Sequence, residues 1–176
     1  MTDPLLRAAR AIDRLSLWSG RLVAWLIVPM VLCLVWEVAA RYLFMAPTVW
    51  AYDLTYMLYG TFFMLGSAYT LAKKGHIRTD TFYGDWSPRT QGIVDSLCYL
   101  LFIPALVAML WVGWFYFQRS FLQGERIVTS PWMPIVWPFK FVIPLTAAML
   151  LLQSLSELIK SLHAARTGHW PAGDAR

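Results

Sequence analysis

Charged residues are scarce in this chain. They make up 14% of its 176 residues, whereas apolar residues make up 59% and aromatic residues 16%. A soluble domain with this composition would expose large apolar patches to water, so the lipid bilayer is its natural solvent. The formal net charge of +5 comes from basic residues that are spread along the chain rather than gathered in one patch. We therefore expect no nucleic-acid binding.

Cysteine and histidine are also rare. The two cysteines, Cys33 and Cys98, lie within apolar stretches and form no Cys-x-x-Cys motif. This spacing argues against a disulfide framework and against thiol redox chemistry. The three histidines lie outside the long apolar stretches, so we do not expect haem held between membrane helices.

One histidine has a spacing that a metal site can use. His76 and Asp80 are four residues apart, which places two ligands on one face of a helix. No third ligand of a suitable type lies nearby, and Gly75 favours a helix end here, so a cap and turn is the preferred interpretation. We predict no catalytic residue, no cofactor and no metal site, and hence a protein that is not an enzyme.

Long apolar stretches dominate the remainder of the chain. They predict an all-α integral membrane protein with four transmembrane helices, at about residues 22–44, 50–72, 90–118 and 137–162. About 20 residues of helix cross a hydrocarbon layer of ~30 Å, and each stretch is long enough. Gly60, Gly66, Ser67 and Ala68 supply small surfaces for close helix approach. Residues 1–166 form a single domain in this interpretation, and residues 167–176 form a flexible tail.

The N-terminal segment is basic and amphipathic. Residues 2–20 predict a short helix that lies in the membrane interface, with its arginines towards anionic headgroups. Its apolar side carries Leu5, Ile12 and Leu15, and its basic residues near the other side are Arg7, Arg10, Arg14 and Arg21. A disordered basic tail is the alternative. The long arginine-rich start and the charges within the first apolar stretch argue against a cleaved signal peptide.

A few charges fall inside the predicted spans. Glu37 and Arg41 are four residues apart, so we expect an ion pair on one helical face. An unpaired charge at membrane depth costs at least about 2.5 kcal/mol, which favours pairing. Asp53 stands in the first turn of the second span, where a carboxylate complements the helix dipole. Across the short connection it could reach Arg41 and complete a Glu37–Arg41–Asp53 cluster.

The distribution of basic residues predicts the orientation. Residues 1–21 carry four Lys and Arg, residues 73–89 carry four, and the segment from residue 160 onward carries three. The opposite side holds four: Arg41, Arg119, Arg126 and Lys140. The first side therefore carries eleven basic residues and the opposite side four. Because basic residues favour the cytoplasmic side, both termini are predicted to lie in the cytoplasm. On the other side, the segment 119–139 is rich in proline and tryptophan, including Trp132 and Trp137, which indicates an ordered loop pressed on the membrane or on a partner.

Several short motifs resemble a known family. They are Arg41-Tyr42, then Trp50 and Asp53, then Gly66, then Gly75-His76-Ile77-x-x-Asp80, and finally Trp86-Ser87-Pro88-Arg89. In this order they resemble the small membrane subunit (DctQ-like) of tripartite ATP-independent periplasmic (TRAP) transporters. The resemblance covers essentially the whole chain, and the His-Ile-x-x-Asp element after two lysines is its most specific part.

The resemblance implies a role in transport. It implies a bacterial inner-membrane protein that works with a large multispan subunit, a soluble periplasmic substrate-binding protein and membrane lipids. In such systems the large subunit carries the sodium and substrate sites, the substrates are usually organic acids, and the small subunit braces the scaffold. An autonomous small channel or transporter, and a membrane anchor of an enzyme complex, are the alternatives.

Two hypotheses concern particular residues. Glu37, Arg41 and Asp53 fix the outer hairpin of the first two spans, and the Trp132–Trp137 loop lies near the docked binding protein. His76 and Asp80 are carried over as positions of the family pattern, without a role as substrate ligands.

Overall fold

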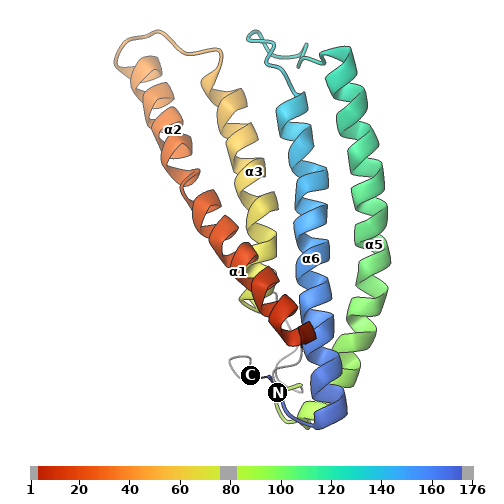
Figure 1. Cartoon of the computed structure of the whole chain (residues 1–176). Coiled ribbons are helices and arrows are strands. Elements are labelled where there is room, and N and C mark those ends of the chain that lie inside the picture. The colour runs from red at the N-terminus through yellow and green to blue at the C-terminus, as the bar shows by residue number, and fades with distance from the viewer. Residues whose placement is uncertain (1–3, 76–82, 172–176) are drawn as a thin grey trace.

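The computed structural model describes residues 4–75 and 83–171 of the chain. Its helices are α1 (Pro4–Ala24), α2 (Ile27–Tyr42), α3 (Ala51–Ala72), α5 (Pro88–Gln123) and α6 (Trp137–Thr167). The helices run side by side, with α1 and α2 joined into one long bent rod (Figure 1). The name "terminal end" is used for the end of the bundle at which α1 begins and α6 finishes. The other end, where α2 connects to α3 and α5 connects to α6, is the loop end.

The helical fold agrees with the composition, and the prediction of an all-α protein is confirmed. Among the described residues, three helical segments are long and apolar enough to cross a membrane: Pro4–Tyr42, Pro88–Gln123 and Trp137–Thr167. The fourth predicted span, α3, is not among them, because tyrosine, threonine and serine hydroxyls lower its apolar character. Four spanning helices and their orientation therefore stay a prediction.

The break between α1 and α2 has a local cause. Pro29 has no N–H to donate to the carbonyl of Trp25, and its ring crowds that carbonyl. The backbone tightens there: the Trp25 N–H bonds to the Leu22 carbonyl at 3.1 Å, and the Val28 N–H bonds to the Trp25 carbonyl at 3.1 Å. A proline at this position of the first apolar stretch predicts either a kink or a proline tolerated in the first turns, and the structure shows the break. The alternative of a disordered basic tail is wrong, because α1 continues from Pro4 to Ala24.

Helices α5 and α6 form a long hairpin. Helix α5 begins after Ser87, whose hydroxyl accepts the Thr90 N–H at 3.3 Å, and it ends at Gly124, whose φ of 57° suits glycine. Its 36 residues correspond to about 54 Å of helix, longer than the hydrocarbon layer and longer than the predicted span 90–118. Helix α6 likewise continues past residue 162 and ends before Gly168.

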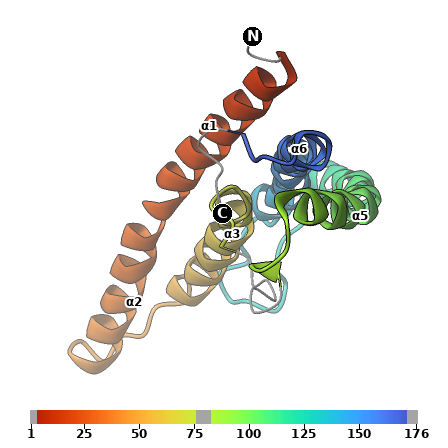
Figure 2. The same cartoon turned by 90° about the horizontal axis from the view of Figure 1, so that it is seen from below.

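Close packing of α5 on α6 depends on a glycine. A Cβ atom at Gly92 would lie 2.6 Å from the Ser161 carbonyl oxygen and 2.6 Å from the Ala165 nitrogen. The two backbones can approach only because that atom is absent, as is common between membrane helices. In the view from below, α5 and α6 lie together, and the α1–α2 rod begins near α6 and runs away from it past α3 (Figure 2).

The interior of this bundle is made largely of polar and small residues, and its outer surface is apolar. The fully buried residues of α6 are Ala147, Gln153, Ser154, Ser156, Glu157, Ser161 and Ala164. Large apolar residues such as Leu101 and Trp111 are about as exposed as surface residues of soluble proteins, at 79% and 68%. Such an arrangement suits a bilayer, in which the lipid covers apolar side chains and helices associate through small and polar ones.

Part of the expected flexible tail is structured. Thr167 belongs to α6, and the Trp170 indole N–H donates to the side-chain oxygen of Gln91 at 3.1 Å. The Lys74 ammonium lies 5.4 Å from the centre of the Trp170 ring. Residues 167–171 therefore fold back on the terminal end. Residues 172–176 lie outside the described residues.

Candidate functional site

A clamp at the loop end closes the connection between α2 and α3. The Arg41 guanidinium donates to Glu37 Oε1 from Nε at 3.0 Å and from Nη2 at 2.5 Å. The other carboxylate oxygen of Glu37 accepts the Thr48 N–H at 3.0 Å and the Thr48 hydroxyl. The predicted Glu37–Arg41 ion pair is therefore confirmed. One carboxylate joins the last turns of α2 to the segment that leads into α3.

Asp53 does not join this clamp, so the predicted contact between Asp53 and Arg41 is wrong. Asp53 is buried and accepts a hydrogen bond from the Ser130 hydroxyl, whose oxygen in turn accepts the Trp132 N–H at 3.2 Å. The Arg41 side chain is 55% exposed and turned to Glu37 on its own helix. The two groups face different neighbours. Asp53 thus fastens the start of α3 to the loop between α5 and α6.

That loop is ordered by its own backbone. Arg126 and Ile135 form an antiparallel bridge, and the Ile127 N–H bonds to the Pro134 carbonyl at 3.1 Å. The Arg126 guanidinium caps the turn by donating to the Met133 carbonyl at 3.0 Å. The loop is therefore ordered, as its proline and tryptophan content predicts.

An ion pair ties the loop to α6. The Lys140 ammonium donates to Glu125 Oε2 at 2.5 Å and lies 3.9 Å from the centre of the Tyr116 ring, a cation–π contact. The hydrogen bond from Lys140 holds the pKa of the Glu125 carboxyl below its ordinary value. Glu125 is partly exposed whereas Lys140 is nearly buried, so the loop supplies the counter-charge that a buried ammonium requires.

The two tryptophans of the loop hypothesis have different surroundings. Trp137 opens α6, and its ring packs edge-on against Phe121 at 5.2 Å between centroids. Trp132 is 42% exposed on the loop. Together with its exposed neighbours it forms what we call the loop-end apolar rim: Leu122, Val128, Trp132, Met133 and Ile135. Trp132 is therefore the more accessible of the pair, since Trp137 is half-buried.

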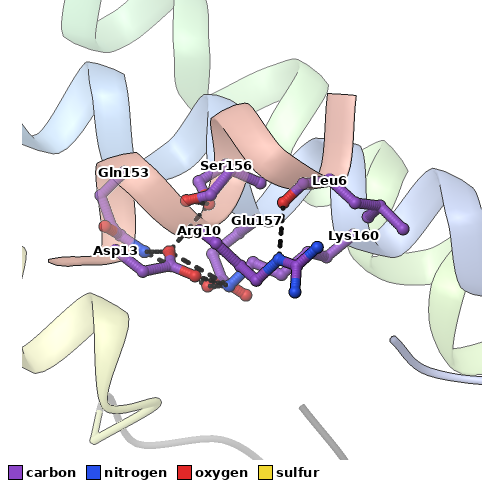
Figure 3. A network of polar contacts seen from close by, with 8 residues as sticks. Leu6, Arg10, Asp13, Gln153, Ser156, Glu157 and Lys160 are labelled. Carbon is purple, nitrogen blue, oxygen red and sulfur yellow. Dashed lines mark hydrogen bonds and ion pairs between the residues drawn. The ribbon is translucent and has the colours of Figure 1, made fainter. Parts of the chain in front are cut away.

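A second polar cluster lies between α1 and α6 at the terminal end (Figure 3). Asp13 of α1 points at α6, where the Lys160 ammonium donates to its Oδ2 at 3.0 Å. The same ammonium donates to Glu157 Oε1 at 2.5 Å. The Gln153 amide and the Ser156 hydroxyl donate to Asp13 Oδ1 at 2.9 Å and 2.8 Å. We call these residues the α1–α6 network.

The α6 side of this network is buried, whereas the Asp13 side chain is 21% exposed. Gln153, Ser156 and Glu157 have no exposed surface, and Lys160 is 2% exposed. Two carboxylates therefore share one ammonium in a setting of low polarity, where an uncompensated charge is costly. Hydrogen bonds from the glutamine and serine side chains offset part of the excess negative charge. The network fixes the angle between α1 and α6.

The sequence signals for this network lie entirely in α6.

 Glu157 and Lys160 are spaced three residues apart, and Gln153 lies one turn before Glu157, so the three share a helical face. A polar face on an otherwise apolar helix indicates a partner inside the protein. Sequence reasoning did not find Asp13, because 147 residues separate it from Lys160.

The remaining predicted positions are His76 and Asp80. Both lie outside the described residues, so their roles stay predictions. The described polar clusters at the two ends are made of ion pairs and hydrogen bonds that join one element of the chain to another. Chemically, these arrangements hold helices and loops in place.

The fold and these clusters define a class of protein: a helical membrane protein with an apolar exterior and polar contacts inside. Residues 30–164 match the family described as tripartite ATP-independent periplasmic transporters, DctQ component. This match covers most of the chain, and the chain belongs to the DctQ family of small TRAP transporter subunits. No significant match is found among curated proteins.

Proposed function

We propose that this chain is the non-catalytic small subunit that braces the large membrane subunit of a sodium-coupled TRAP transporter. The transporter imports an organic acid or a related small solute. The observation that carries the proposal is the family match over residues 30–164. The polar clusters support a bracing role, because they fasten helices and loops to one another at both ends.

In this proposal the chain crosses a bacterial inner membrane four times, with both termini in the cytoplasm. Three observations support it. The α1–α2 rod, α3, α5 and α6 run between the same two ends (Figure 1). Helix α3 has 22 residues, about 33 Å, which is enough to cross the hydrocarbon layer. Eleven of the fifteen basic residues lie in segments that the proposal assigns to the cytoplasm.

Helix α2 offers the surface for the large subunit. Helix α2 packs against α3, and Ala40 is its one buried residue, while large apolar side chains such as Leu32 and Val35 remain exposed. The Glu37 clamp fixes the end of this helix relative to α3. A rigid apolar helix with an open face suits a partner that lies in the same bilayer, and lipids cover the rest.

The loop-end apolar rim is the proposed contact for the periplasmic substrate-binding protein. Trp132 is its central aromatic residue, and the backbone around it is fixed by the Asp53–Ser130 and Arg126–Met133 contacts. Rigid exposed tryptophans are favoured at protein interfaces because they bury much area at little cost in conformational entropy.

A pull-down of the tagged chain from its native membrane in mild detergent tests the proposed role. Mass spectrometry should identify a large multispan protein, together with a periplasmic binding protein under crosslinking conditions. Solute uptake by liposomes that hold both membrane subunits, with the binding protein added, should require a sodium gradient. Recovery of the chain alone with flux through it, or recovery with a cofactor-bearing enzyme, would contradict the proposal.

Replacement of Arg41 by alanine tests the bracing clamp. Arg41→Ala removes both hydrogen bonds to Glu37 Oε1, so we expect less large subunit in the pull-down and an unchanged substrate preference. Arg119→Ala is the matched control, because Arg119 is exposed near the same end and makes no hydrogen bond or ion pair within the described residues. Normal assembly of Arg41→Ala with an altered substrate preference would refute the clamp.

Crosslinking tests the proposed contact with the binding protein. A photo-reactive amino acid in place of Trp132 should capture the binding protein in a working complex. The same amino acid in place of Trp111, which is 68% exposed in the middle of α5, is the control. Absence of capture from position 132 would remove the loop-end apolar rim from the proposal.

A further inference from the structure

A groove lies between α1 and α3, towards the end of α1. Its volume is about 480 Å³, and its wall is mostly apolar. Side chains of Phe62 and Phe63 from α3 and Val23 from α1 line it. This volume falls in the range of sites that bind small molecules.

Glycines shape the groove. The two helices touch where Gly20 meets Tyr69, since a Cβ atom at Gly20 would lie 2.4 Å from the Tyr69 Cβ. About one turn away on α3, a Cβ atom at Gly66 would have no atom within 4 Å. Gly66 was expected to support close helix approach, and instead it leaves open space. The groove therefore exists because α3 has no side chain at this position.

The serine and threonine hydroxyls in the groove wall are occupied by the backbone of α3. The Ser67 hydroxyl donates to the Met64 carbonyl at 2.6 Å, and the Thr70 hydroxyl donates to the Gly66 carbonyl at 3.1 Å. Neither donor is left for a polar ligand. The groove therefore suits a hydrocarbon chain.

One charged residue, Arg21, lines the groove. It is exposed and forms no ion pair or hydrogen bond with the residues that the structure describes. On either side of it along the chain, Trp18 of α1 is 60% exposed and Trp25, directly after α1, is 72% exposed. Exposed tryptophans mark the interface of a membrane, so Arg21 lies at the depth of the lipid headgroups.

We propose that the groove binds an anionic phospholipid, with one acyl chain between Phe62, Phe63 and Gly66 and its phosphate on Arg21. Arginine pairs with phosphate through charge-assisted hydrogen bonds, which explains why a guanidinium without a carboxylate partner among the described residues stands beside an apolar groove. The bound lipid fills the space between α1 and α3 and holds the end of α1 at the membrane surface. The proposal needs the chain to lie in a bilayer but does not depend on its role in transport.

Photo-crosslinking of the full chain in phosphatidylcholine nanodiscs tests this site. The probe is phosphatidylglycerol with a diazirine on one acyl chain, at low mole fraction, and a phosphatidylcholine probe of the same chain length is the comparison. We expect phosphatidylglycerol adducts on residues 62–70. Gly66→Leu should abolish most of them, because a Cβ atom at this position has no atom within 4 Å and the rest of the added side chain occupies the groove.

Charge variants separate a specific headgroup contact from general attraction. Arg21→Gln should lower phosphatidylglycerol labelling by about tenfold, the loss of one charge-assisted contact, and leave phosphatidylcholine labelling unchanged. Arg14→Gln is the matched control, since Arg14 is exposed seven residues away on the same helix and does not line the groove. It should leave the labelling unchanged.

Three results would overturn the proposal. The first is labelling of residues 62–70 that is absent or equal for the two probes. The second is an equal loss from Arg14→Gln and Arg21→Gln, which indicates diffuse attraction. The third is that the lipid probes no longer label the chain in the intact complex, while a cysteine introduced by Gly66→Cys crosslinks to another protein there. This result would indicate that a protein covers the groove. If Gly66→Leu fails to fold, the two arginine variants still decide the question.

Discussion

From the α1–α6 network we predict that loss of the Lys160 charge destabilises the protein. This ammonium is the shared donor for two carboxylates, Asp13 at 3.0 Å and Glu157 at 2.5 Å, and it is 2% exposed. Lys160→Met keeps the length and apolar stem of the side chain and removes only its charge. The substitution leaves two carboxylates close together, one of them fully buried, without a cation between them.

The expected loss of stability is large. Removing one partner of a buried ion pair destabilises proteins by about 3–5 kcal/mol, because the remaining charge is buried without compensation. The Gln153 and Ser156 donors still reach Asp13, so the lower part of that range is the more reasonable expectation. Replacing the charges together, with Asp13→Asn, Glu157→Gln and Lys160→Met, should restore most of the loss, since no buried charge remains.

Reversible unfolding in mixed detergent micelles measures these differences. Lys73→Met is the matched control, because Lys73 is an exposed lysine at the same end, and its loss should change the unfolding free energy by less than about 0.5 kcal/mol. A double-mutant cycle between Asp13→Asn and Lys160→Met should give a coupling energy of about 1 kcal/mol or more, as expected for groups in direct contact.

Two outcomes would refute this reasoning. One is a Lys160→Met protein as stable as Lys73→Met. The other is a triple variant less stable than Lys160→Met alone, which would mean that the charges themselves stabilise the fold.

Three further predictions concern other contacts. Ser130→Ala removes the hydrogen bond to buried Asp53 and should cost about 1–3 kcal/mol in the same unfolding assay, whereas Ser130→Thr should cost less. Because its hydrogen bond with Lys140 lowers the folded-state pKa of Glu125, this carboxyl should add stability above the ordinary pKa of glutamate. That stability should be lost as the pH falls through the lowered value, and Glu125→Gln should flatten the pH dependence of unfolding. Gly92→Val should separate α5 from α6 and lower the yield of folded protein in size-exclusion chromatography, because its Cβ would meet backbone atoms at 2.6 Å.

Local features of the structure could be read from the sequence because their causes are local. The bend at Pro29 follows from a missing N–H, and the Glu37–Arg41 pair follows from the rise of one helical turn. The order of the loop 124–136 follows from its prolines and tryptophans. Each of these depends on residues within a few positions of one another.

The predicted cluster around Asp53 shows where this reasoning ends. Helical spacing gives the face on which Asp53 lies, but it does not give the neighbour that this face meets. In the folded chain that neighbour is Ser130, 77 residues away, and not Arg41. The carboxylate of Asp53 accepts a hydrogen bond from the donor that tertiary packing places beside it.

The sequence by itself determined a helical membrane protein, the course of its apolar stretches, the basic terminal end and the family to which it belongs. These follow from composition, spacing and short motifs. Only the tertiary structure decided that Asp13 meets Lys160, that Trp137 is half-buried against Phe121 while Trp132 is exposed, and that Gly66 opens a groove. The physical reason is that the rotation and tilt of each helix about its neighbours depend on the whole set of packed side chains.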